Sequence, residues 1–310
     1  MKLRASPALL LLSVFLLPAA SCTQIPARAQ SSPKPPLEYL NAWGVKGGGP
    51  GQFDDPGNIT TDAVGNVFVA DTGSGFLQKF SSDGAPLLAF QEYGMDHPQW
   101  ITLDSGGAIY ATDPASNAFF VFLPDGDKYR EVRLRSKRTG ENTLSVAVGA
   151  DGVVHVLDSN AARVFIYTSR LRFARIWKPA GLVPGDARQP LTIEGGPDGS
   201  LYIAEPANNR IERFSSDGRL VNEIDGRSDR AGSRLSTRFA VSAGAVFVMD
   251  ADGRMLHVFT PDGNFKFDRD LAPELGQANR PPPPLAVSPH HELWVLDAQE
   301  SRVLCYRINF

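Results

Sequence analysis

Short stretches of alternating apolar and polar residues, separated by turn residues, recur from residue 37 to residue 307. In the first unit, residues 59–62 and 67–70 flank a turn at Gly65, and Phe76–Phe80 and Pro86–Phe90 flank an Asp-Gly turn. A period of two is typical of β-strands with one buried face, and Gly and Asp-Gly close tight hairpins. The pattern predicts a four-stranded antiparallel meander, and no useful helical period competes with it.

The same unit occurs six times. An acidic residue ends each second strand and an aromatic residue follows it nine positions later, with adjacent acids 42 to 47 residues apart. In five units Gly stands six positions before the acid, where a hairpin favours positive φ. The acids are Asp71, Asp113, Asp158, Glu205, Asp250 and Asp297. This period is typical of propellers and solenoids, and it predicts an all-β, six-bladed β-propeller with four antiparallel strands per blade.

The two ends of this region predict how the ring closes. The sixth unit stops after its third strand, near Arg307, and residues 37–43 (LEYLNAW) precede the first unit as a lone strand. Pairing of this N-terminal strand with the last unit would complete the sixth blade and remove an open sheet edge.

Two segments resemble NHL repeats: GQFDDPGNITTDAVGNVFVADTGSGFLQKF at 51–80 and EGGPDGSLYIAEPANNRIERFSSDG at 194–218. The resemblance extends over nearly all of 37–310, although Glu205 replaces the usual Asp and the third and fifth repeats are degenerate. It implies the propeller fold. Its members include protein-binding propellers, sensor domains and a few enzymes, so the fold carries over and the function does not.

We interpret the repeated acids as structural. A carboxylate at the end of a strand can accept backbone N–H groups and hold the following turn. Arg163, Arg210 and Arg302 each stand five positions after an acid and could pair with it. Six carboxylates spread around a ring would not converge on one substrate.

The N-terminus predicts export and a lipid anchor. Lys2 and Arg4 precede an apolar run at 9–17, which predicts a signal peptide over 1–21. Ala19-Ala20-Ser21-Cys22 resembles a bacterial lipobox, which implies acylation of Cys22; cleavage after Ala29 is the alternative. By resemblance to Gram-negative sorting rules, Thr23 after the anchor favours the outer membrane, with the protein facing the periplasm.

Residues 22–36 are rich in Pro, Ser, Gln and Ala and predict a tether that reaches about 40 Å when extended. Removal of 1–21 leaves 29 basic against 34 acidic residues, which argues against nucleic acid as a partner. Cys305 would be the one remaining cysteine besides Cys22, and we expect it to be a small core residue. A monomeric propeller is expected, in the bacterial envelope or, without the anchor, soluble in the periplasm or secreted.

Residues that open the first strands should ring the mouth of the central channel, and here the repeat does not fix residue type. They are Asn58, Trp100, Ser145, Thr192, Arg238 and Pro284, followed two positions deeper by Thr60, Thr102, Ala147, Glu194, Ala240 and Ala286. We assign Asn58, Trp100, Thr192, Glu194 and Arg238 as a candidate site for a small polar or anionic, sugar-like ligand. In the alternative, Trp100 plugs the channel and Arg238 pairs with Glu194.

A metal site is not expected. The propeller enzyme that the family resemblance suggests, the peptidyl-hydroxyglycine amidating lyase, holds zinc with histidines near the axis. Here His155 occupies a slot that is aromatic in the other units, and the remaining histidines fall at separate places: His97, His257, His290 and His291. No cofactor is therefore expected, and a divalent metal in the channel stays an open alternative with Glu194 as its sole inner carboxylate.

A basic flank, which comprises Arg130, Arg133, Arg135, Arg138, Arg172 and Arg175, stands out on this acidic chain. It could meet an anionic glycan, lipid headgroups or an acidic envelope protein, or it could be a solvated outer face. The leading hypothesis is a membrane-tethered, non-enzymatic recognition or scaffolding propeller. The alternative is a metal-dependent lyase or lactone hydrolase at the channel.

Overall fold

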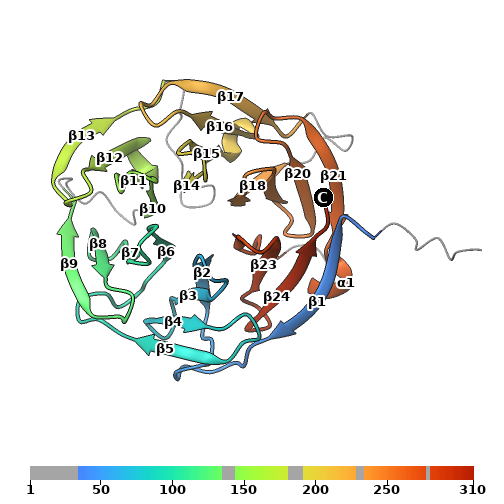
Figure 1. The fold of residues 1–310 in the computed structure, drawn as a ribbon, viewed down its shortest axis with the longest axis horizontal. Helices are drawn as coiled ribbons and strands as arrows, with labels where there is room; N and C mark the ends of the chain where they lie inside the picture. The colour runs from blue at the N-terminus through green and yellow to red at the C-terminus, as the bar shows by residue number, and fades with distance from the viewer. Residues whose placement is uncertain (1–33, 135–143, 181–190, 228–233, 277–279) are drawn as a thin grey trace, which may run out of the picture. The chain divides into compact units, whose positions relative to one another are not determined.

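The structure is a computed structural model that describes residues 34–134, 144–180, 191–227, 234–276 and 280–310. The chain from Pro35 to Phe310 is one compact unit, built from six four-stranded antiparallel sheets around a central channel (Figure 1). First strands of consecutive blades contact one another, and β22 of the last blade contacts β2 of the first. The predicted six-bladed all-β propeller is confirmed.

From the channel outward, blade 1 contains β2 (Pro56–Thr61), β3 (Val67–Asp71), β4 (Phe76–Phe80) and β5 (Pro86–Phe90). Blade 2 contains β6 (Trp100–Leu103), β7 (Ile109–Asp113), β8 (Ala118–Phe122) and β9 (Lys128–Arg133). Blade 3 contains β10 (Leu144–Val148), β11 (Val154–Asp158), β12 (Arg163–Tyr167) and β13 (Phe173–Trp177). Blade 1 differs slightly from expectation: β2 begins at Pro56, because Pro56 pairs with Asp71 ahead of a bulge.

Blade 4 contains β14 (Thr192–Gly195), β15 (Leu201–Glu205), β16 (Arg210–Phe214) and β17 (Leu220–Asp225). Blade 5 contains β18 (Leu235–Val241), β19 (Val246–Asp250), β20 (Met255–Phe259) and β21 (Phe265–Asp270). Blade 6 contains β22 (Leu285–Ser288), β23 (Glu292–Asp297), β24 (Arg302–Ile308) and β1 (Leu37–Trp43). The short helix α1 (Ala272–Leu275) lies before blade 6. Within the residues described, no helix combines the length and apolar character needed to cross a membrane.

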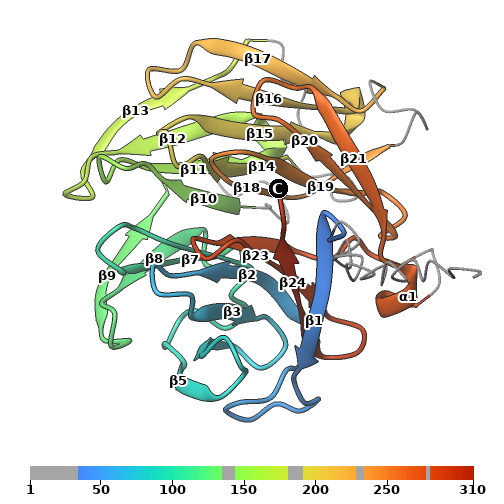
Figure 2. The same ribbon diagram turned by 45° about the vertical axis from the view of Figure 1, so that its right-hand side comes forward.

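The N-terminal strand closes the ring, as predicted. β1 pairs antiparallel with β24, from Leu37 opposite Ile308 to Trp43 opposite Val303, and Figure 2 shows the two strands side by side. The Trp43 ring then packs 5.0 Å from Phe80 of blade 1, centroid to centroid. Closure therefore uses both backbone pairing within blade 6 and aromatic packing against blade 1.

The core lies between blades rather than inside one sheet. Every residue of the second strands β3 and β7 is buried, whereas most of the outer strand β9 is exposed or half-buried. One apolar cluster joins Ile59 and Val67 of blade 1 to Trp294 and Val303 of blade 6. Cys305 belongs to this cluster and is 2% exposed, which confirms it as a core residue, and burial raises the pKa of its thiol to about 12.

The repeated acids accept backbone N–H groups from the turn that follows them, as predicted, for example at 2.8 Å from Ala115 to Asp113. They also accept N–H groups from the loop that leads into the blade. Both carboxylate oxygens of Asp71 accept the Asp54 backbone N–H, at 2.9 and 3.0 Å, and Asp113 accepts the N–H of Asp96 at 3.0 Å. Each donor lies seventeen positions before its acid, in the loop that leads into the blade. The expected arginine pairs also form, at Asp158–Arg163, Glu205–Arg210 and Asp297–Arg302.

These contacts define two faces of the ring. The loop face carries the loops into first strands and the turns after the repeated acids, such as residues 72–75. The hairpin face carries the turns between first and second strands and between third and fourth strands. The predicted positive φ occurs at Gly65 (86°), Gly107, Gly152 and Gly199 but not at Gly244 of blade 5, so that part of the prediction is wrong. His291, at the same position in blade 6, also takes a positive φ, of 59°.

Candidate ligand site at the channel mouth

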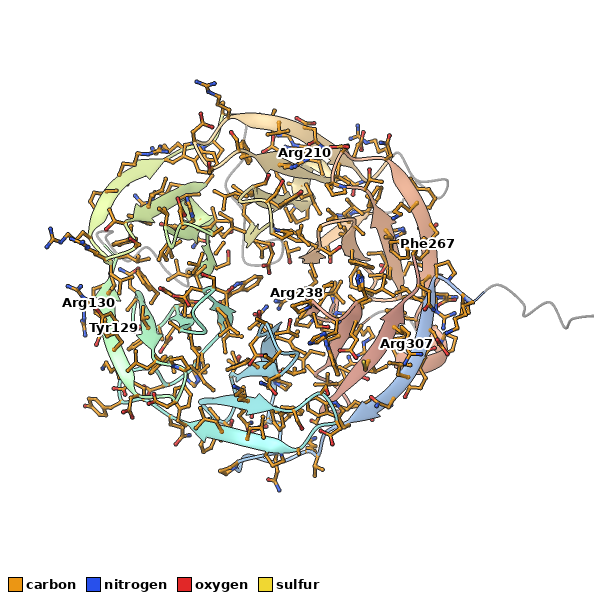
Figure 3. All side chains as sticks on the ribbon, in the orientation of Figure 1. Tyr129, Arg130, Arg210, Arg238, Phe267 and Arg307 are labelled. Atoms are coloured by element: carbon orange, nitrogen blue, oxygen red, sulfur yellow. The ribbon has the colours of Figure 1, made fainter. Side chains whose placement is uncertain are left out.

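Arg238 crosses the mouth of the channel on the loop face. It stands on β18 of blade 5, and its guanidinium carbon lies 5.9 Å from the ring centroid of Trp100 on β6. Blades 5 and 2 are opposite each other in a six-membered ring, and Figure 3 shows Arg238 projecting toward the centre. A cation in this position over an indole is stabilised by about 0.5–2 kcal/mol of cation–π interaction. The contact therefore favours a conformation in which Arg238 spans the mouth of the channel.

Trp100 is 4% exposed, with Arg238 over its ring. While the guanidinium holds this position, the indole is not free to stack on a ligand. Of the two predicted roles for Trp100, the geometry therefore gives more support to a ring that fills the channel mouth.

Three other mouth residues connect neighbouring blades. Asn58 Oδ1 accepts the Ile101 N–H at 3.2 Å, Ser145 Oγ accepts the Ile193 N–H at 3.1 Å, and Thr192 Oγ1 donates to the Thr237 carbonyl at 2.8 Å. Asn58 and Thr192 are 3% and 2% exposed. Because these polar atoms satisfy backbone groups of the next blade, their placement is that of inter-blade links.

Glu194 lies deeper, on β14, and lines a channel cavity of about 180 Å³ together with Thr60, Thr102, Ala240 and Ala286. These are residues of the predicted second layer. Burial raises the pKa of Glu194 to about 8, because the charged form loses hydration, and the positive charge of Arg238 opposes this rise. The carboxyl group is therefore mostly protonated at pH 7.

Arg238 and Glu194 influence each other without direct pairing. Desolvation lowers the pKa of Arg238 to about 10, and the charge of Glu194 opposes that shift. Among the described residues, no carboxylate stands at ion-pair distance from the Arg238 guanidinium. Arg238 is thus a half-buried cation that no described carboxylate neutralises by contact.

A hollow of about 320 Å³ opens beside this guanidinium on the loop face. It is lined by Asp55, Pro56, Gly57, Thr72, Gln99, Arg238, Arg280, Pro281, Pro282, Pro283, Pro284, Leu296, Ala298 and Gln299. Arg280 is 6% exposed, donates to the Leu275 carbonyl at 2.6 Å and pairs with Asp297. Its charge is therefore already engaged, and Arg238 is the lining arginine left for an anionic group.

Arg280 and Gln99 are neighbours of the mouth that the repeat register does not predict. A signal for Arg280 was present, since it stands seventeen positions before Asp297, the spacing that relates Asp54 to Asp71 and Asp96 to Asp113. Gln99 carried no such signal.

The histidines do not converge. His155 is 4% exposed between blades, and His257 is fully buried on β20, where its Nδ1 lies 2.6 Å from Asp268. His290 and His291 lie in a hairpin, and His97 is exposed on the loop face. Within the described part of the chain, no three His, Cys, Asp or Glu side chains are grouped so that they could hold a metal ion.

The described residues of the basic flank lie on or directly beside the outer strands β9 and β13. Arg130 on β9 projects outward in Figure 3 and donates to the Arg170 carbonyl at 3.5 Å, while Arg133 pairs with Glu131. Arg172 and Arg175 are exposed at β13. Arg135 and Arg138 lie outside the described residues. Binding of a partner by this flank stays a prediction.

No known family model matches the chain, and no curated protein matches it in sequence. Solved structures do resemble it. A streptogramin B lyase structure has a TM-score of 0.62 and 16% identity, over 88% of this chain and 97% of that one. A catalytically inactive histidine-to-alanine variant of virginiamycin B lyase from Staphylococcus aureus, with quinupristin, has a TM-score of 0.59 and 16% identity, over 82% and 80%.

Raptor from Chaetomium thermophilum has a TM-score of 0.55 and 12% identity, over 80% of this chain and 23% of that one. At these identities the likeness concerns the fold alone. The neighbours comprise both enzymes and a protein not named as one, so the fold is compatible with both functional hypotheses.

Proposed function

We propose that the chain is a non-enzymatic recognition propeller of the NHL type, anchored in the bacterial envelope through acylated Cys22, which holds an anionic glycan or an acidic protein group on its loop face. The observation that carries the proposal is Arg238, a half-buried cation at the channel mouth beside a hollow of about 320 Å³, with no carboxylate of the described residues in contact with it. A ligand carboxylate there would gain a charge-assisted hydrogen bond in a partly desolvated place.

Trp100 supports Arg238 in this proposal rather than touching the ligand. The indole fixes the guanidinium over the channel, which lowers the entropy lost when an anion binds. Glu194 below, protonated at neutral pH, adds no full negative charge beneath Arg238. The tether of 22–36 would hold this face within reach of envelope polymers.

The test uses trigalacturonate as the anionic probe and a neutral galactose trimer as its match, with affinity measured by calorimetry. The proposal expects the acid to bind at least about tenfold more tightly. Arg238→Gln should remove that preference, Arg238→Lys should retain part of it, and Arg219→Gln, an exposed arginine on a distant hairpin, should leave it unchanged. Equal affinity for the two probes, or an unaltered preference in Arg238→Gln, would contradict the proposal.

The second candidate is a metal-dependent lyase or lactone hydrolase, favoured by the similarity to the streptogramin B lyase fold over nearly its whole length. Glu194 with Thr60 and Thr102 would be its donor set, which provides a single carboxylate of raised pKa. Hard divalent cations generally take several oxygen ligands, so this set fits a metal poorly. A stoichiometric metal whose removal abolishes a lyase or hydrolase activity would replace the first proposal by this one.

A further inference from the structure

The hairpins between the first and second strands of blades 3 and 4 have the same hydrogen-bond pattern, but different side chains lie beside them. In blade 4, Asp198 Oδ1 accepts the Ser200 N–H at 3.0 Å; in blade 3, Asp151 Oδ1 accepts the Val153 N–H at 3.0 Å. Each hairpin also closes with a glycine N–H on the carbonyl three positions earlier. Asp151 and Asp198 are therefore held in equivalent positions on the hairpin face.

In blade 4 an arginine fills the position next to this acid. Arg213 pairs with Asp198 at 2.6 Å, and its guanidinium carbon lies 5.8 Å from the ring centroid of Tyr202, its partner on the adjacent strand. Blade 1 has a similar arrangement, in which Lys79 pairs with Asp62 at 3.3 Å and lies 5.0 Å from the Phe68 ring. A cation between a hairpin acid and a ring is thus a recurrent element of this fold.

Blade 3 lacks that cation. The strand position of Arg213 is occupied by Ile166, and that of Tyr202 by His155. A cavity of about 340 Å³ results, lined by Gly149, Ala150, Asp151, Val153, His155, Ile166, Arg175, Gly199 and Ser216. Within the described residues, no basic side chain stands at ion-pair distance from Asp151. The place that Arg213 occupies in blade 4 is open in blade 3.

The cavity also carries a positive charge on its outer side. Arg175 stands one strand farther out than Ile166, in the position of Asn222 in blade 4. The base of the cavity is His155, which is 4% exposed. Burial lowers its pKa to about 4, so the ring is neutral at pH 7 and does not repel a cation.

We propose that this cavity between blades 3 and 4 binds a small zwitterion of the α-amino-acid class. The ammonium group takes the place of the Arg213 guanidinium, between Asp151 and the neutral His155 ring, and the carboxylate faces Arg175. An apolar side chain of the ligand packs on Val153 and Ile166. The site is on the hairpin face, so it is independent of the function proposed for Arg238 on the loop face.

Three matched probes test the charge requirement on the purified protein: L-leucine, N-acetyl-L-leucine, which lacks the ammonium group, and L-leucinamide, which lacks the carboxylate. Calorimetry or ligand-observed NMR should show leucine binding at least about tenfold more tightly than either derivative. Absence of leucine binding at tens of millimolar, or equal affinity for the three probes, would overturn the proposal.

Two variants locate the site. Ile166→Arg should fill the cavity as Arg213 does in blade 4 and abolish leucine binding while the protein stays folded. Asp151→Asn retains the hairpin acceptor for Val153 and should weaken binding by about tenfold. Asp125→Asn is the control, because Asp125 makes the same type of hairpin bond, to the Asp127 N–H, away from the cavity. Unchanged leucine affinity in a folded Ile166→Arg or Asp151→Asn variant would also overturn the proposal.

Discussion

Arg238 and Trp100 meet across the axis of the propeller, from opposite blades, with 5.9 Å between the guanidinium carbon and the indole centroid. Most contacts in this fold join neighbouring strands or neighbouring blades, so a cross-channel contact links parts of the ring that are otherwise connected only around the circumference. It also fixes the one cation that we assign to ligand binding on the loop face.

We expect this contact to be measurable as a coupling between the two side chains. In a double-mutant cycle with Trp100→Leu and Arg238→Met, urea unfolding should give a coupling of about 0.5–2 kcal/mol. A parallel cycle of Arg238→Met with Trp177→Leu, whose ring packs on Phe214 away from the channel, should give none. Equal coupling in the two cycles would mean that the channel contact contributes nothing specific.

Glu194 should make the stability of the protein depend on pH. Its folded pKa of about 8 lies above its unfolded value of 4.5, so the folded state favours the protonated form. The stabilisation is fully present below pH 4.5 and is lost as the pH rises toward and through 8. Allowing for solvent screening of a group that is not fully buried, the loss should be on the order of 2 kcal/mol.

Glu194→Gln replaces the protonated carboxyl by a neutral group of similar shape. We expect its urea midpoint to match that of the wild type near pH 4.5 and to exceed it at pH 9. The matched control is Glu38→Gln, the same carboxylate-to-amide change on the half-exposed outer strand β1, outside the channel. Parallel pH profiles for wild type and Glu194→Gln would show that Glu194 is ionised at neutral pH.

The fold could be predicted from the sequence because its determinants are local. Strand alternation, the Gly65-type hairpins and the repeated acids each act within one blade, and the number of repeats gives the number of blades. Closure by β1 was also predictable, since the sixth repeat lacks a fourth strand. The exact start of β2 was not, because the bulge after Pro56 depends on its pairing with Asp71.

The candidate site was predictable only as a set of positions. The register of the repeats predicts that Trp100, Glu194 and Arg238 line the channel. It does not predict that Arg238 reaches the opposite blade, because this contact depends on the width of the channel and on the direction of the side chain. The cavity at Ile166 was missed for a related reason. An isoleucine fits the alternating pattern of a strand, so the sequence does not indicate a cavity beside it. The cavity is recognised only by comparison with blade 4, where Arg213 fills the equivalent space.

The buried pair Arg280–Asp297 should be essential for the loop that leads into blade 6. Arg280 is 6% exposed and Asp297 is fully buried, and Arg280 also donates to the Leu275 carbonyl at the end of α1. Arg280→Met leaves Asp297 with the Arg302 guanidinium and the Glu300 N–H as partners, and it removes the buried half of the charge pairing, so the unfolding free energy should fall by about 3–5 kcal/mol.

Urea unfolding followed by tryptophan fluorescence measures this loss. Asp262→Asn, which removes an exposed carboxylate from its 3.2 Å pair with Arg213, is the control and should cost less than about 1 kcal/mol. Similar losses in the two variants would indicate that burial adds nothing to the Arg280 pair.

The predicted lipid anchor involves residues outside the described structure, and it is tested by determining whether Cys22 is acylated. In a Gram-negative host grown with labelled palmitate, the wild-type chain should incorporate label and fractionate with the outer membrane, because acylation of the new N-terminus is what retains it. Cys22→Ser should lose the label, whereas Cys305→Ser should keep it, since the buried Cys305 side chain is not available for acylation.

Mass spectrometry of the mature protein distinguishes the two predicted cleavage sites. An acylated N-terminal Cys22 supports the anchor. An unmodified N-terminus at Gln30, from cleavage after Ala29, would make the protein soluble in the periplasm or secreted.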